Sequence, residues 1–396
     1  MTRNKLSSFP SELLKQAPKD REKYFSEIII AHPFLTETCE TLLENIENSE
    51  KGSLIFVHGP SGVGKTTLAE KIQQQVTMNM AADLKEDVGR YPIVKVIAPA
   101  PDGGNFSYSD LYKRLLAALN EPCINSKSMT TFVNGQSDRI ELIHRKRTAT
   151  SAELRFAVER SLQLRRPLAA LVDEAQHIAK IASGRRLQDQ LDVIKFLSIS
   201  TRIIFVLFGT YELLPFRNLS AQLSRRSTDI HFRRYRADVK NERDAFKSVV
   251  HTFQSHLRLA EVPKLDENWE FLYERSIGCV GSLRDWLVKA LALALKDKAP
   301  TLELRHLQKS ASSIAQCKKM LEDAREGEEL LQENEEARSL FRASLGLEPA
   351  VVGRSQNAKI QNPSKNGSAR TRRRPGQRNP KRDPVGEKGS YAPQDL

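Results

Sequence analysis

The sequence predicts an α/β fold in which helices flank a parallel five-stranded sheet, followed by a small helical domain and a basic tail. Three observations predict it. Short apolar segments recur at the intervals of a parallel sheet, a glycine-rich motif directly follows the first of them, and strand-like segments stop after about residue 237.

Five apolar segments are the candidate strands. Their continuous apolar character implies burial on both faces, so helices must cover both sides of the sheet. The intervening stretches have helical periodicity, as in Leu68, Ile72 and Val76, which recur every four residues. The candidate strands are SLIFVHG (53–59), YPIVKVIAP (91–99), PLAALVDE (167–174), RIIFVLFGT (202–210) and DIHFRRY (229–235).

Composition divides the chain into five parts. The last part is rich in Pro, Gly, Asn, Ser and Arg and nearly free of aromatic residues, which is typical of a disordered segment. The acidic part before it is helix-prone, with an interruption expected at Gly327. The predicted parts are a helical N-terminal lead-in (1–50), an α/β nucleotide-binding domain (51–236), a helical lid domain (237–325), an acidic helical extension (326–348) and a disordered basic tail (349–396).

Charge and cysteine usage limit the partners and the compartment. The net charge is +13, and residues 354–396 contribute eleven Lys/Arg against three Asp/Glu, so the tail carries most of an excess that favours a polyanionic partner. No apolar run approaches the roughly 18–20 residues of a membrane span, and the start of the chain lacks a secretory core. We expect a cytoplasmic protein, without membrane contact, whose cysteines are free, buried thiols; they are Cys39, Cys123, Cys279 and Cys317.

A glycine-rich motif follows the first candidate strand. Residues 59–66 fit the pattern G-x-x-x-x-G-K-[ST], in which the backbone N–H groups of the loop point at phosphates. The helix that starts near Lys65 adds the positive end of its dipole, Lys65 can reach the β- and γ-phosphates, and the Thr66 hydroxyl can bind Mg²⁺. The predicted nucleotide-binding residues are Gly59, Pro60, Ser61, Gly62, Val63, Gly64, Lys65, Thr66 and Thr67.

The segment LAALVDEAQH supplies two carboxylates at the end of the third candidate strand. Asp173 emerges where ligands bind in α/β sheets and can hold Mg²⁺ through water, while Glu174 can orient or deprotonate the attacking water. Taken alone, the pair also fits a helix N-terminus with acidic first-turn residues. A DEAH helicase is excluded, because the residues after 237 predict helices and a tail instead of a second sheet domain.

Three further features narrow the class. Thr210 ends a strand next to Asp173, where its hydroxyl could sense the γ-phosphate or simply bond the local backbone. Arg225 and Arg226 precede the last strand and could reach a neighbouring subunit's site, or form a solvated pair that closes a helix. Arg284 lies beside the apolar stripe of a lid helix, either turned toward the nucleotide or at the surface.

Together these features keep the order and rough spacing of an AAA+ ATPase: P-loop, acidic Walker B pair, polar sensor, trans-acting arginine and lid arginine. AAA+ proteins work as rings or helical assemblies, because each site is completed by its neighbour.

Four motifs resemble more specifically the TniB/TnsC family of transposition ATPases. They are GPSGVGKTT, ALVDEAQHI, FVLFGTYEL and QLSRRS, with AHP upstream of the first strand, and the resemblance covers roughly residues 25–300. It implies ATP as the nucleotide. The residue roles that it implies are Mg²⁺ binding for Thr66 and Asp173, water activation for Glu174, sensor 1 for Thr210, the arginine finger for Arg225 or Arg226, and sensor 2 for Arg284.

The resemblance also implies partners. Members of this family assemble on double-stranded DNA when ATP is bound, and link a TniQ-like target selector to a DDE transposase of the TnsB/TniA kind, whose stimulation of hydrolysis strips the homo-oligomer. Some members serve CRISPR-guided transposons. The long basic tail departs from the shorter members, and the N-terminal extensions of the larger members are missing from this sequence.

A basic run provides a separate indication of DNA binding. Arg145, Lys146 and Arg147 precede a predicted helix in a loop that would line the inner face of an AAA+ assembly, where phosphate contacts give salt-dependent, sequence-independent affinity. A solvated charge run before a helix is the other interpretation. The tail could likewise bind DNA, fold against a partner or serve as a solubilising end. The competing functions are a STAND-like signalling NTPase and a secretion-type ATPase acting on protein partners.

Overall fold

The computed structural model describes residues 9–102, 104, 106–127, 149–179, 185–217, 227–332 and 335–347. The chain divides into two compact units, Met1–Gln332 and Glu333–Leu396. The second contributes one described helix, α16 (Glu335–Ser344). The sheet and the lid belong to the first unit.

A five-stranded parallel sheet forms the centre of this unit, in the order β2-β3-β4-β1-β5. The predicted α/β fold class is therefore confirmed. The fifth strand lies further toward the N-terminus than predicted, because the chain leaves the sheet after His231 and continues as the linker to the lid. The strands are β1 (Leu54–His58), β2 (Ile93–Ile97), β3 (Ala169–Asp173), β4 (Ile204–Gly209) and β5 (Ser227–His231).

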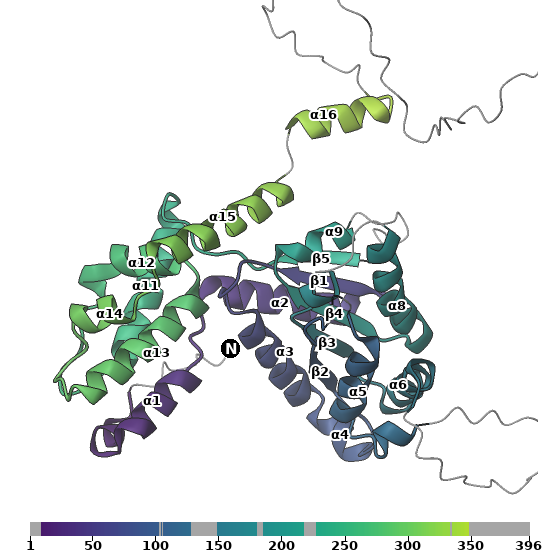
Figure 1. The fold of residues 1–396 in the computed structure, drawn as a ribbon, viewed down its shortest axis with the longest axis horizontal. Helices are drawn as coiled ribbons and strands as arrows, with labels where there is room; N and C mark the ends of the chain where they lie inside the picture. The colour runs from purple at the N-terminus through teal and green to yellow at the C-terminus, as the bar shows by residue number, and fades with distance from the viewer. Residues whose placement is uncertain are drawn as a thin grey trace, which may run out of the picture. The chain divides into compact units, whose positions relative to one another are not determined.

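Helices cover both faces of the sheet, as the apolar strands require. Figure 1 shows α3 on one side and α5, α6 and α8 on the other. Alternate residues of β1 serve the two cores: Ile55 and Val57 face α2 and α3, whereas Leu54 and Phe56 face α5, α6 and α8. The elements of this part are α2 (Pro33–Asn48), α3 (Lys65–Asn79), α4 (Ala81–Glu86), α5 (Tyr108–Ala118), η2 (Ile124–Ser126), α6 (Ser151–Arg165), α7 (Gln176–Ala179), α8 (Arg185–Thr201), η3 (Tyr211–Leu213) and α9 (Leu214–Arg217).

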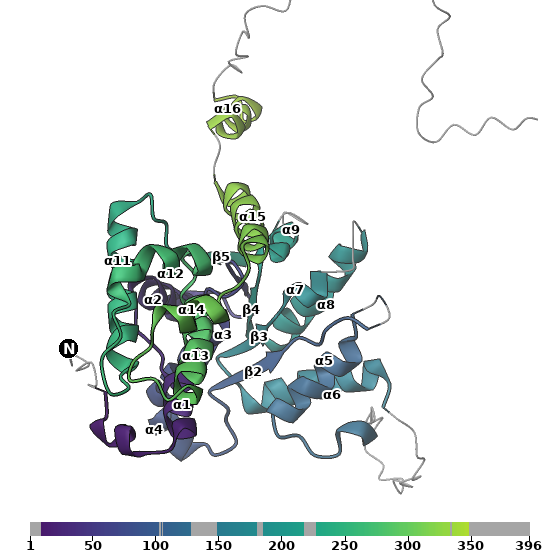
Figure 2. The same cartoon turned by 60° about the vertical axis from the view of Figure 1, so that its left-hand side comes forward.

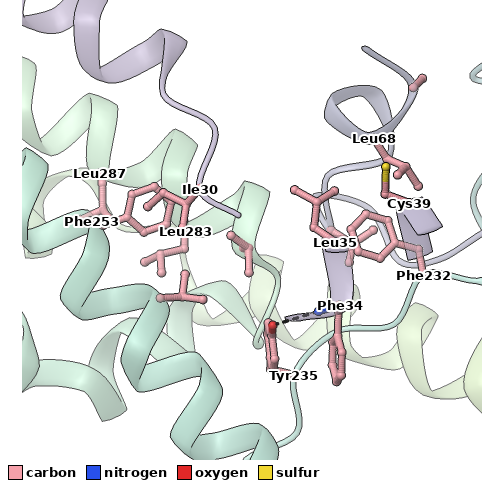
Figure 3. Packing of buried hydrophobic residues seen from close by; sticks show 14 of the residues in the cluster. Ile30, Phe34, Leu35, Cys39, Leu68, Phe232, Tyr235, Phe253, Leu283 and Leu287 are labelled. Carbon is pink, nitrogen blue, oxygen red and sulfur yellow. Dashed lines mark hydrogen bonds between the residues drawn. The ribbon is translucent and has the colours of Figure 1, made fainter. Parts of the chain in front are cut away.

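The lid is helical, and its core is continuous with one face of the sheet. The predicted apolar stripe of Leu283, Leu287 and Leu291 is buried. Figure 3 shows Ile30, from the segment before α2, beside Phe253 and Leu283 of the lid. The lid helices are α11 (Lys240–His256), η4 (Asp266–Asn268), α12 (Trp269–Ser276), α13 (Val280–Lys296), α14 (Leu304–Ser310) and α15 (Ile314–Leu331), and the lead-in adds η1 (Ser11–Lys15) and α1 (Pro18–Glu27), of which α1 packs on α13.

The helix α15 contradicts the interruption expected at Gly327. It runs without a break from Ile314 to Leu331, and so also crosses the predicted domain boundary after residue 325. Gly327 is buried against the ring of Tyr211, where an added Cβ would overlap the ring atoms. The glycine therefore permits a close helix contact, a tertiary reason that helix propensity does not contain. The predicted domain boundaries remain a prediction.

Two composition-based expectations have different outcomes. Cys39, Cys279 and Cys317 are free and buried as predicted, but Cys123 is exposed at the positive-φ residue before η2, so the expectation of a buried thiol is wrong there. Among the described residues, no helix is long and apolar enough to cross a membrane. The predicted tail lies outside the described residues.

The start of α2 is fixed by a buried histidine. His32 Nδ1 accepts from Leu35 N (3.4 Å) and so caps the helix, and it lies 2.9 Å from Tyr235 Oη, which in turn accepts from Phe34 N. Because Nδ1 acts as the acceptor, the ring is neutral and the Tyr235 hydroxyl donates to it. Burial, and after it the charge of Lys71, lowers the pKa of His32 to about 4.

Acidification is expected to destabilise the protein through His32. In the unfolded chain His32 binds a proton with an ordinary imidazole pKa of about 6.5, whereas in the folded chain its pKa is about 4. The protein therefore loses stability as the pH falls from about 6.5 to about 4. At pH 4.5 this residue should lower the free energy of unfolding by roughly 2–3 kcal/mol relative to pH 7. Urea unfolding at both pH values should show a smaller loss for His32→Asn, which keeps a capping oxygen. Equal losses in both proteins would contradict the assignment, since the other histidines are common to both.

Candidate nucleotide-binding site

The phosphate loop connects β1 to α3 at the carboxyl end of the sheet. Gly62 and Gly64 have φ values of +76° and +115°, which side chains with a Cβ rarely adopt, and Gly64 is the N-cap of α3. Lys65 is the first residue of the helix, and Thr66 and Thr67 follow in its first turn. The predicted motif thus has the strand–loop–helix context that phosphate binding requires.

Lys65 is turned onto its own loop. Its ammonium donates to the carbonyl oxygens of Gly59 (2.9 Å) and Pro60 (2.8 Å), and the side chain is buried. Burial lowers the pKa of Lys65 to about 8, although Cys279, Glu174 and Asp173 act in the opposite direction. The loop therefore holds a partly desolvated cation, which phosphate oxygens would stabilise in its charged form.

The two residues predicted to hold Mg²⁺ lie together. Thr66 Oγ1 donates to Asp173 Oδ2 at 2.8 Å, while Asp173 Oδ1 accepts from the backbone N–H of Glu174 at 2.9 Å. Asp173 is the last residue of β3 and is buried. A hydroxyl and a carboxylate oxygen are donors that suit Mg²⁺, which takes its remaining ligands from phosphates and water.

Glu174 is held in an unusual backbone conformation. Its φ is +54°, in the left-handed region, between the end of β3 and the start of α7. Gln176 Nε2 donates to Glu174 Oε2 (2.6 Å), and Gln176 Oε1 accepts from Thr210 N (3.3 Å). Gln176 thus connects the carboxylate of Glu174, directly after β3, to the backbone of Thr210, directly after β4. Sequence reasoning gave Gln176 no role, although it stands inside the quoted VDEAQH motif.

Thr210 follows directly after β4, on the same edge of the sheet. Its hydroxyl oxygen is buried and has no hydrogen-bond partner within the described part of the chain. The alternative interpretation of Thr210, a hydroxyl hydrogen-bonded to the local backbone, therefore does not apply within the described residues. An unpaired buried hydroxyl is costly, and a ligand oxygen at this position would satisfy it.

The first turn of α13 contacts the phosphate loop. Ser282 N donates to the Gly62 carbonyl oxygen at 2.8 Å, and a Cβ at Gly281 would lie 2.6 Å from that same oxygen. A Cβ at Gly62 would overlap the Ser282 side chain. Arg284, one turn further, lies in the wall of a pocket beside Gly64 and pairs with Asp285 at 2.9 Å.

That pocket is largely apolar and was missed by sequence reasoning. Residues from the lead-in, the phosphate loop and the lid form it together, so it exists only in the folded chain. A signal was present in EIIIAHP, the apolar stretch before α2. Its apolar lining includes Ile28, Ile30, Leu35, Val63, Phe253 and Val280.

Two groups of predicted residues lie outside the described residues. They are the finger candidates Arg225 and Arg226 and the DNA-binding candidates Arg145, Lys146 and Arg147. Their roles stay predictions. The structure brings together the other predicted residues: the loop 59–67, Asp173, Glu174, Thr210 and Arg284.

Comparison with known proteins agrees with this fold and this loop. Residues 47–216 match the model of the AAA domain family, and together with the strand order and the phosphate loop this match indicates an AAA+ P-loop fold. A search of curated proteins found no match.

The chain is also similar to several solved structures at low sequence identity. The ORC2 protein of Aeropyrum pernix is 16% identical, over 74% of this chain and 72% of that one, with a TM-score of 0.46. The ORC1 protein of the same organism, in complex with DNA, is 14% identical over 71% and 65%, with a TM-score of 0.48. A Walker-type ATPase of Pyrococcus abyssi is 18% identical over 78% and 76%, with a TM-score of 0.42.

Nucleotide affinity is expected to fall at alkaline pH through Lys65. Phosphates favour the charged ammonium, so above its pKa of about 8 binding must take up a proton, and the Kd for ATP should rise by up to about tenfold per pH unit. Lys65→Ala should weaken binding by about 100-fold at pH 7.5 and remove most of this slope. Titration calorimetry from pH 7 to 9.5 measures both effects. Lys85→Ala, on the exposed face of α4, is the control. An unchanged slope in Lys65→Ala would contradict the assignment.

Proposed function

We propose that this chain is an AAA+ ATPase that regulates DNA transposition by assembling on double-stranded DNA in its ATP-bound form. The observation that carries the proposal is the grouping of Lys65, Thr66, Asp173, Glu174 and Thr210 at one edge of the sheet around a phosphate loop. These groups come from three separate strand ends, and each matches a need of nucleotide hydrolysis.

In this proposal the loop binds the phosphates of ATP and the apolar pocket takes the base. Lys65 leaves the carbonyl oxygens of Gly59 and Pro60 when phosphate oxygens replace them as partners. Thr66 and Asp173 hold Mg²⁺, which neutralises charge on the phosphates when it is bound. Val63 and the lid residue Val280 contribute to the walls around the base.

Hydrolysis then depends on Glu174 and its supports. The carboxylate orients and deprotonates the attacking water, and Gln176 keeps it in place relative to Thr210. Thr210 Oγ1 donates to the γ-phosphate or the water, which gives this buried hydroxyl its missing partner. Arg284 from the lid, and Arg225 or Arg226 from a neighbouring subunit, stabilise the developing charge.

The DNA and transposition parts rest on the sequence. The TniB/TnsC-like motifs occur in order along the chain, and the net charge of +13 suits a phosphate backbone. The proposed partners are double-stranded DNA, a TnsB/TniA-like transposase, a TniQ-like target selector and further copies of this chain.

Binding of labelled duplex DNA tests whether ATP controls assembly on DNA. Binding is expected with ATP and Mg²⁺, but not with ADP or without nucleotide, and it should weaken steeply between two salt concentrations. Lys65→Ala should abolish it, because the loop can no longer hold the phosphates. Fluorescence anisotropy measures the binding. Binding that ignores nucleotide and disappears only when residues 349–396 are removed would overturn the proposal.

Glu174→Gln separates hydrolysis from assembly. The amide keeps an acceptor for Gln176 but cannot take a proton, so phosphate release should fall at least about 100-fold while ATP-dependent DNA binding persists. The control Glu86→Gln removes an exposed carboxylate of α4 and should leave both unchanged. Hydrolysis that survives in Glu174→Gln would show that another group activates the water.

A further inference from the structure

The helix α15 packs on the carboxyl edge of the sheet beside the candidate site. Its Gly327 lies against the ring of Tyr211, the residue that follows Thr210, and Tyr211 Oη lies 2.9 Å from His231 Nε2 at the end of β5. This contact places the helix backbone, without an intervening side chain, against the segment that carries the predicted sensor. Figure 2 shows α15 between α12 and α9, and its contacts are with α12 and η3.

A buried ion pair fixes the same end of α15. Glu328 accepts two hydrogen bonds from Arg234, at 2.8 and 3.0 Å, and the two side chains are 17% and 8% exposed. Arg234 also donates to the Ile277 carbonyl oxygen at 3.3 Å. Arg234 belongs to the segment between β5 and α11, so this pair ties α15 to the linker between the sheet and the lid. Breaking one partner of a buried pair is costly, because it leaves the other charge uncompensated.

The other end of α15 is attached to the lid. Cys317 Sγ contacts the Arg275 carbonyl oxygen at 3.5 Å, and Arg275 donates to the Ser312 carbonyl oxygen at 3.0 Å. One helix therefore bridges α12 of the lid and η3 of the α/β part. Rotation of the lid relative to the sheet would therefore disrupt the contact between Gly327 and Tyr211.

A cavity of about 480 Å³ separates α15 from the phosphate loop. One wall is formed by the loop and the end of β4, and the facing wall by α15, where Lys319 pairs with Asp323 at 2.8 Å. The residues that define it are Pro60, Ser61, Thr210 and Glu212 on one side and Asp323 and Glu326 on the other. The cavity borders Pro60 and Ser61 of the phosphate loop and Thr210, the predicted sensor, so α15 lies over the open side of the candidate site.

We propose that α15 is an autoinhibitory clasp, which holds the lid and the sheet together and covers the nucleotide site against a second copy of this chain. The inference rests on the proposed function in one respect, since the covered face matters only if copies assemble. ATP releases the clasp through the lid, because Ser282 contacts Gly62 in the loop that receives the phosphates. Assembly is then limited by the fraction of molecules whose clasp is open.

Two variants of the full-length chain open the clasp by different routes. Gly327→Leu places a side chain against the Tyr211 ring and at the same time favours the helix, so it separates the contact without unfolding α15. Glu328→Gln weakens the pair with Arg234. The matched controls are Glu322→Leu and Glu329→Gln, exposed positions on the same helix.

The experiment measures assembly and clasp opening separately. Mass photometry with ATP, Mg²⁺ and duplex DNA should show both variants assembling at about tenfold lower protein concentration than the wild type and the controls. Hydrogen exchange of residues 319–330 in dilute wild-type protein should become faster when ATP is added.

The outcomes distinguish the clasp from the proposed function. Variants that assemble at the wild-type concentration, or that lose assembly while still binding ATP, would overturn the clasp, the latter by showing that α15 supports the interface. If neither the wild type nor any variant assembles on DNA, the proposed function fails. Hydrogen exchange then tests the clasp by itself: faster exchange of residues 319–330 with ATP supports the clasp, and unchanged exchange overturns it.

Discussion

The backbone contact between Gly62 and the first turn of α13 sets the relation between the two parts of the site. The N–H groups at the start of a helix have no partner within it, and here the Ser282 N–H bonds the carbonyl oxygen of the phosphate loop. Both Gly62 and Gly281 are required for this approach, because a Cβ at either position would meet the other chain segment. The lid is thus positioned directly against the predicted phosphate loop.

Other features of the first unit follow from this arrangement. Arg284, three residues after Gly281, lies beside Gly64 because its helix begins at the loop. The core of the lid merges with the core beneath α2 and α3, and Ile30 lies beside Phe253 and Leu283 of the lid (Figure 3). A continuous apolar core resists separation of the parts, so nucleotide binding can act on the lid as a packed body. The bridging helix α15 adds a second connection, from α12 of the lid to η3 at the carboxyl end of β4.

Much of the fold could be predicted because the central strands are buried on both faces and therefore read as apolar runs. The edge strand β5 was displaced in the prediction, since it begins with the polar residues Ser227, Thr228 and Asp229, which carry no such signal. The phosphate loop could also be predicted, because the residues that define it are adjacent in the sequence. By contrast, the roles of Gln176 and Ser282 depend on β3, β4 and α13 meeting at one edge, which no local pattern expresses. Gly327 shows the same limit: an isolated glycine predicts a weak helix, whereas the packing of Tyr211 determines what it does.

The candidate site contains two unfavourable local features that rigid surroundings hold in place. Glu174 has a left-handed backbone that costs on the order of 1 kcal/mol for a residue with a side chain, and the Thr210 hydroxyl is buried without a partner in the described residues. Such unfavourable conformations persist only where surrounding contacts hold them in place. Here the buried strands β3 and β4 hold Glu174 and Thr210, and Gln176 bridges the two residues. A water or phosphate oxygen placed between Glu174 and Thr210 would relieve the unpaired hydroxyl without moving the backbone. The arrangement therefore favours a site whose polar groups are already held in place by the buried strands before a ligand binds.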